Sequence, residues 1–103
     1  MNMQEMMRQA KRMQAKVEKM QAELAQKTVE GTAGGGMVKA VANGAQQLVS
    51  LEIEKEVVDP EDLEMLQDLV TAAVNQALER SREMSNEEMS KLAGGMGLPP
   101  GML

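Results

Sequence analysis

The sequence contains no cysteine, no histidine and no aromatic residue among its 103 positions. Without cysteine or histidine, the chain excludes a disulfide, a thiolate nucleophile, an imidazole base and a zinc site built from these ligands. Without aromatic rings it offers unpaired bases no stacking surface. No apolar run is long enough to cross a bilayer and no signal peptide opens the sequence, so we expect a cytoplasmic protein.

Positive charge is concentrated at the start of a chain that is acidic as a whole. The formal net charge is −5, but residues 1–27 carry six basic and three acidic side chains, whereas residues 28–103 carry five basic and thirteen acidic ones. A basic element on an acidic body indicates a polyanionic partner, although solvated helices often carry such an excess without any binding role.

Residues 2–27 lack glycine and proline and are predicted to form an amphipathic helix. Their apolar residues recur at alternating spacings of four and three and form a heptad seam on one side: Met6, Ala10, Met13, Val17, Met20 and Leu24. Basic residues fall on the other side: Arg8, Lys11, Arg12, Lys16, Lys19 and Lys27. The helix is therefore expected to have one apolar and one basic face.

Glycine-containing turns divide the middle of the chain into three predicted strands. Gly34-Gly35-Gly36 is unsuited to a helix interior, and Asn43-Gly44 is a strong hairpin signal. We expect antiparallel strands over residues 28–33, 37–43 and 46–55. In the last of them Val49, Leu51 and Ile53 alternate with polar residues, which predicts that these three share one buried face.

A second long helix is predicted over residues 60–91. Asp59 is suited to cap it and Pro60 to occupy its first position. The polar stretch Ser85–Glu88 is either a break or part of one continuous helix, and Gly94-Gly95 is expected to end it.

The elements together predict one α+β domain over residues 1–93, with the order α-β-β-β-α and a three-stranded antiparallel sheet, followed by a flexible Gly/Pro tail over 94–103. A helix of the predicted length exceeds what a compact domain of this size can cover, and bare edge strands invite pairing. A homodimer that joins the sheets and projects the helices satisfies both demands.

The remaining patterns with chemical interest have simpler explanations. The Gly31–Gly36 segment lacks the Lys-Ser/Thr pair and the following helix of a phosphate-binding loop, so it is interpreted as a turn. The clustered carboxylates fall on an exposed strand face and a helix start, where solvation explains them better than catalysis does. Methionines at heptad spacing are more often core residues than copper ligands, and the mild apolar face disfavours membrane binding. We therefore expect no catalytic residue, metal, cofactor, small-molecule substrate or membrane partner.

Several segments resemble a known family. Val29-Glu30-Gly31-Thr32-Ala33-Gly34-Gly35-Gly36-Met37-Val38-Lys39, followed by Asn43-Gly44, resembles the central signature of the YbaB/EbfC nucleoid-associated proteins. The family pattern continues in order and spacing through Asp59-Pro60-Glu61-Asp62, Leu66-Gln67-Asp68-Leu69-Val70, Ala72-Ala73-Val74-Asn75-Gln76-Ala77, Gly94-Gly95-Met96 and Leu98-Pro99-Pro100-Gly101. The resemblance covers essentially the whole chain.

The resemblance implies a tweezer-like homodimer with a sheet core and long projecting N- and C-terminal helices. It also implies binding of double-stranded DNA in the bacterial nucleoid, a regulatory role in some members, and no catalytic residue. The basic residues that carry over to the DNA-binding helices are Arg8, Lys11, Arg12, Lys16, Lys19, Arg80 and Arg82. The alternative hypothesis is a non-catalytic dimeric module whose Met-rich heptad seam accepts a helix from a partner protein.

Overall fold

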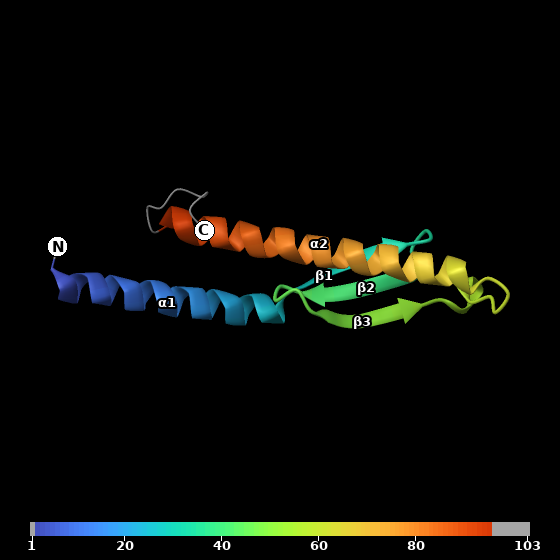
Figure 1. Ribbon diagram of the computed structural model, residues 1–103, viewed down its shortest axis with the longest axis horizontal. Helices are drawn as coiled ribbons and strands as arrows, with labels where there is room; N and C mark the ends of the chain where they lie inside the picture. The colour runs from blue at the N-terminus through green and yellow to red at the C-terminus, as the bar shows by residue number, and fades with distance from the viewer. Residues whose placement is uncertain (1, 96–103) are drawn as a thin grey trace.

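The computed structural model describes residues 2–95 and has the predicted helix–three strands–helix order (Figure 1). The elements are α1 (Met3–Gln26), β1 (Thr28–Ala33), β2 (Val38–Asn43), β3 (Leu48–Ile53), a short 3-10 helix η1 (Lys55–Val57) and α2 (Leu63–Gly95). The three strands form one antiparallel sheet in the order β1-β2-β3. The α+β architecture expected from the sequence is confirmed; the flexible tail expected from residue 94 onward falls, from residue 96, outside the described residues.

Helix α1 begins where its sequence provides a cap. The Asn2 side chain accepts a 2.8 Å hydrogen bond from the Glu5 amide, which satisfies one of the free N–H groups of the first turn. With 24 residues, α1 is about 36 Å long and extends away from the sheet, past the end of α2 (Figure 1).

The core lies between α2 and one face of the sheet. Val38, Ala40 and Ala42 of β2 are completely buried against α2, which contributes Ala73 and Ala77. These small side chains allow the helix to approach the strands closely. Helix α2 lies over β1 and β2 and leaves β3 largely uncovered.

Two sequence-based predictions about β3 are wrong: which of its residues share a face, and whether they are buried. The register shifts where Val41 pairs with Ser50 and the next residue of β2, Ala42, pairs with Leu48, which leaves Val49 as an extra residue in β3. As a result Leu48, rather than Val49, joins Leu51 and Ile53 opposite the buried residues of β2. The expected burial of Val49, Leu51 and Ile53 is also wrong. These three residues and Leu48 are between 38% and 56% exposed. The reason is that α2 does not reach the edge strand. We call Leu48, Leu51 and Ile53 the β3 apolar row.

The start of α2 also differs from the prediction. Asp59 caps a turn, because its side chain accepts from the Glu61 amide at 2.9 Å. The helix begins at Leu63, and the Asp62 side chain accepts from the Met65 amide at 3.2 Å. From there α2 continues without a break through Ser85–Glu88 and includes Gly94 and Gly95.

The molecule is elongated. Its dimensions are 69 × 21 × 16 Å and its radius of gyration is 19.2 Å, compared with about 13 Å for a compact domain of this length. Both long helices run along the longest dimension of the molecule. Beyond one end of the sheet, α1 and the second half of α2 lie side by side (Figure 1).

Candidate nucleic-acid interface

The predicted basic side of α1 is exposed along its whole length. We call its five residues the basic face of α1: Arg8, Lys11, Arg12, Lys16 and Lys19. On the opposite side of the helix Leu24 and Met20 are buried against the body, and Val17 is half-buried. Because the heptad seam is directed at the body, the basic face is directed into solvent.

Arg8 and Arg12 lie one turn apart near the N-terminal end of the basic face. Together with Glu5 and Gln9 they line a shallow surface hollow of about 130 Å³. Guanidinium groups carry several donors in a fixed planar fork that matches phosphate oxygens. This end of the helix is therefore suited to hold two phosphates of a nucleic-acid backbone.

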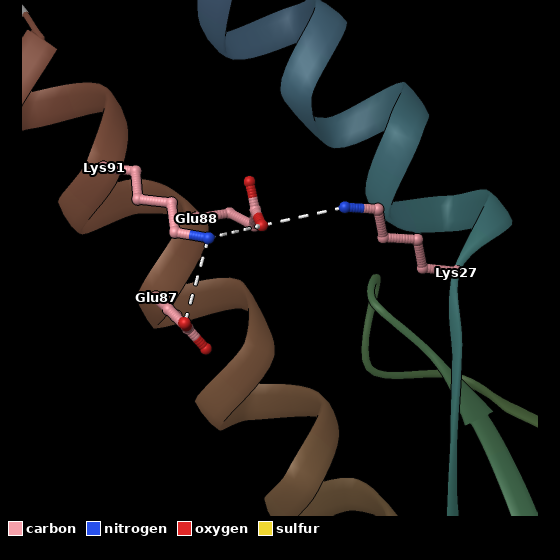
Figure 2. A network of polar contacts seen from close by, with 4 residues as sticks. All are labelled: Lys27, Glu87, Glu88 and Lys91. Atoms are coloured by element: carbon pink, nitrogen blue, oxygen red, sulfur yellow. Dashed lines mark ion pairs between the residues drawn. The ribbon is translucent and has the colours of Figure 1, made fainter.

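The other end of α1 is attached firmly to the body. The Gly44 amide, in the turn between β2 and β3, donates to the carbonyl oxygens of Leu24 at 2.9 Å and Lys27 at 3.1 Å. Figure 2 shows an ion network beside it, in which Glu88 of α2 contacts Lys27 at 3.7 Å and Lys91 at 3.6 Å. These contacts fix the direction in which α1 leaves the sheet.

The two basic residues predicted on α2 do not join the basic face of α1. The Arg80 guanidinium donates a 2.7 Å hydrogen bond to the Glu30 carbonyl oxygen and so ties α2 to β1. Arg82 is exposed, and the acidic residues Glu79 and Glu83 of the same helix are exposed around it. Of the seven predicted site residues, the structure brings five together on one helix.

The outer face of the sheet is not a second cationic surface. Lys39 of β2 lies 3.2 Å from a carboxylate oxygen of Glu52 and 3.9 Å from one of Glu30. The hydrogen bond and the charge of Glu52, with a smaller effect of Glu30, raise the pKa of Lys39 above its ordinary value. The positive charge of Lys39 is thus balanced by carboxylates on the two neighbouring strands, Glu30 of β1 and Glu52 of β3.

Sequence reasoning missed the residues that position α1. Lys27 and Glu88 are far apart in the chain, and no local pattern pairs them. Gly44 was identified only as a hairpin residue, although its amide also caps α1. The family signature around Asn43-Gly44 is the one sequence signal that marks this position.

Other kinds of site are not found in the described part of the chain. Among residues 2–95, no group of three or more His, Cys, Asp or Glu side chains is arranged to hold a metal ion. The helices within the same range are too short or too polar to cross a membrane.

The sequence is similar to those of proteins named as nucleoid-associated. A nucleoid-associated protein of Thermoanaerobacter pseudethanolicus is 59% identical over 98 residues, covering 95% of this chain and 88% of that protein. One from Bacillus cereus is 54% identical over 101 residues, covering 98% and 93%.

The fold is also found in a solved structure. The crystal structure of an uncharacterized protein from Helicobacter pylori superimposes with a TM-score of 0.78 at 24% identity, covering 93% of this chain and 97% of that one. The model of the YbaB/EbfC DNA-binding family matches residues 1–96. The sequence motifs, the fold and these relatives lead to one conclusion: this chain belongs to the YbaB/EbfC DNA-binding family.

Proposed function

We propose that this protein binds double-stranded DNA in the bacterial nucleoid as a cytoplasmic homodimer, through phosphate contacts made by the basic face of α1. The observation that carries the proposal is the alignment of five exposed cations on a helix that projects from the body. The family to which the chain belongs and the names of its relatives support DNA as the polyanion. The proposed role is binding, with any effect on gene expression following from DNA occupancy, and not catalysis.

Contacts to phosphates suit this surface better than contacts to bases. Lysine and arginine side chains spaced along one helix face can follow a phosphate backbone, which gives affinity without reading the sequence. Base recognition needs polar side chains that converge in a groove. Gln9 and Gln14 are on α1, but Gln14 is within 3.4 Å of Glu18 on its own helix.

The β3 apolar row supports the homodimer. Three large apolar side chains are aligned on an edge strand whose outer backbone groups have no neighbouring strand within residues 2–95. Val58 and Leu63, at the same end of the molecule, are about half exposed. A second copy paired along β3 would cover this row and satisfy the open edge, and it would place a second α1 on the complex.

The experiment that tests the DNA contact is a titration of dye-labelled random duplex, followed by fluorescence anisotropy at several salt concentrations. The dye must be on the DNA because the chain has no aromatic fluorophore. Phosphate contacts predict that the logarithm of affinity falls linearly with the logarithm of salt concentration, with a slope of about −0.9 for each phosphate neutralised.

A charge-reversal pair locates the surface. R8E/R12E removes two cations of the basic face, whereas the matched control K55E/R82E makes the same change in net charge on exposed side chains outside α1. We expect R8E/R12E to abolish binding and the control to retain most of it. Equal losses in both variants would show that binding depends on net charge and not on α1.

A second candidate function is favoured by one observation. Met6, in the first turns of the heptad seam, is 57% exposed and is not covered by the body. A partner helix could lie against this part of the seam. Partners that remain bound after nuclease treatment, and that are lost when Met6 and Met13 are replaced by polar residues, would favour this interaction module over DNA binding.

A further inference from the structure

Methionine is the oxidisable residue of this chain. The sequence has twelve methionines and no cysteine, histidine, tryptophan or tyrosine. Two-electron oxidants such as hydrogen peroxide convert methionine to its sulfoxide, and they do so according to access to the sulfur atom. Peroxide chemistry on this protein is therefore decided by which methionines are exposed.

Exposure is greatest at the free end of α1. The side chains of Met3, Met6 and Met7 are 77%, 57% and 55% exposed, whereas Met20, farther along the same helix, is 9% exposed. On the sheet side of the molecule Met37 is 37% exposed. Every residue from 2 to 12 is exposed, so no body contact protects the first turns of α1.

We propose that Met3, Met6 and Met7 form an oxidation site, and that their conversion to sulfoxides by peroxide-class oxidants weakens DNA binding by α1. The effect on binding rests on the proposed function. In each event the thioether sulfur attacks one peroxide oxygen, the S–O bond forms as the O–O bond breaks, and the second oxygen leaves as water. The sulfur is oxidised by two electrons and the peroxide is reduced by two, with no further reactant.

The position of the site explains the expected effect on binding. Met7 and Lys11 are four residues apart and therefore neighbours on the helix surface. A sulfoxide oxygen is a strong acceptor, so at Met7 it competes with phosphate for the donors of Lys11. It also makes an apolar side chain polar. Since the first turns of α1 have no tertiary support, their helical structure depends on the local sequence alone.

The site can be mapped without DNA. Limited treatment of the folded protein with hydrogen peroxide, followed by peptide mass spectrometry, gives the rate of sulfoxide formation at each methionine. We expect Met3, Met6 and Met7 to be oxidised several times faster than Met20 and faster than Met37. Oxidation of Met20 or Met37 at a rate equal to that of the three would overturn the site.

The effect on function is measured by anisotropy with treated and untreated protein. We expect treatment to weaken binding by about fivefold, the equivalent of one hydrogen bond, and methionine sulfoxide reductases A and B together to restore it. The variant M3L/M6L/M7L keeps apolar volume and helix propensity and should bind DNA normally before and after treatment.

The matched control is M37L, which removes an exposed methionine outside α1 and should remain sensitive to peroxide. Met1, Met96 and Met102 lie outside the described residues and are present in all of these proteins, so comparing variants cancels their contribution. If M3L/M6L/M7L loses as much affinity as the parent protein, the inference is wrong. If untreated protein does not bind DNA, the proposed function and the effect on binding both fail, while the peptide map still decides where oxidation occurs.

Discussion

The amide of Gly44 donates a 2.9 Å hydrogen bond to the carbonyl oxygen of Leu24, which joins the β2–β3 turn to the last turn of α1. The final carbonyls of a helix have no partner within it, so this contact caps α1 from another part of the chain. A Cβ atom at position 44 would lie 2.5 Å from the same oxygen and 2.8 Å from the Leu24 Cβ. Only glycine allows the turn to approach α1 this closely.

We therefore expect G44A to lower the free energy of unfolding by about 1–3 kcal/mol, because the helix and the turn must move apart. Far-ultraviolet circular dichroism during urea unfolding measures the change. The matched control is G94A, since no atom of residues 2–95 beyond its neighbours in the helix lies within 4 Å of a Cβ atom there. Its stability should be unchanged or raised by up to about 1 kcal/mol, as alanine favours a helix. Equal effects of the two substitutions would contradict the close-contact explanation.

A second glycine fixes the distance between α2 and the sheet. A Cβ atom on Gly31 would overlap the Ala73 carbonyl oxygen and the Ala77 amide nitrogen, both of which belong to the helix backbone. A backbone cannot rotate away as a side chain can, so we expect G31A to cost about 3 kcal/mol, at the upper end of the usual range for overpacking. Urea unfolding tests this, and a stability equal to that of the unsubstituted protein would show that α2 can shift without cost.

Arg80 and Arg82 are expected to have different roles although they carry the same charge. R80Q removes the guanidinium that donates to the Glu30 carbonyl oxygen and should lower the free energy of unfolding by about 1 kcal/mol. R82Q removes an exposed side chain and should change it by less than about 0.5 kcal/mol. Thermal unfolding of the two variants measures the difference, which should disappear if the Arg80 contact adds nothing to stability.

The β3 apolar row predicts how the proposed homodimer can be dissociated. L51E places a charge in the row, whereas S50E places the same charge on the opposite face of the same strand, where Ser50 pairs with Val41. We expect L51E to be monomeric and S50E to remain dimeric in sedimentation equilibrium. A dimeric L51E protein would place the interface elsewhere.

The ion contacts of Lys39 predict a component of stability that disappears at high pH. Because its pKa is raised in the folded state, the contribution of the lysine is complete below its unfolded pKa of about 10.4 and is lost as the pH rises through the folded value. E52Q removes the main cause, and E54Q is the control with the same charge change on an exposed neighbour. We expect E52Q to be less stable than E54Q at pH ~8, and the difference between them to disappear as the pH rises above the folded pKa of Lys39. A difference that persists at the higher pH would assign the effect to packing.

The parts of the fold that local sequence determines could be predicted, and those that depend on distant packing could not. Asn43-Gly44 specifies a hairpin by its own conformational preferences, and the heptad seam specifies a helix by its period. The expectation that Val49, Leu51 and Ile53 are buried failed because it assumed that the helix covers all three strands. The register shift at Val49 of β3 and the lateral position of α2 are properties of the assembled chain.

The candidate site divides in the same way. The basic face of α1 follows from helical periodicity alone, so its five residues could be grouped from the sequence. Arg80 could not be separated from Arg82, because its partner is a backbone carbonyl on a strand fifty positions earlier. Charge and spacing thus identify residues that face solvent, but they do not reveal which cations are used to hold the molecule together.

In the proposed DNA complex, the spacing of cations along α1 also sets the footprint of a single protomer on a duplex. From Arg8 to Lys19 the helix rises about 16 Å, which corresponds to about five base pairs of B-form DNA. That is about half a helical turn, so one α1 meets the backbone on a single side of the duplex. Protection of a full turn would therefore require two α1 helices. The length of DNA protected from nuclease would then show how many α1 helices contact the duplex.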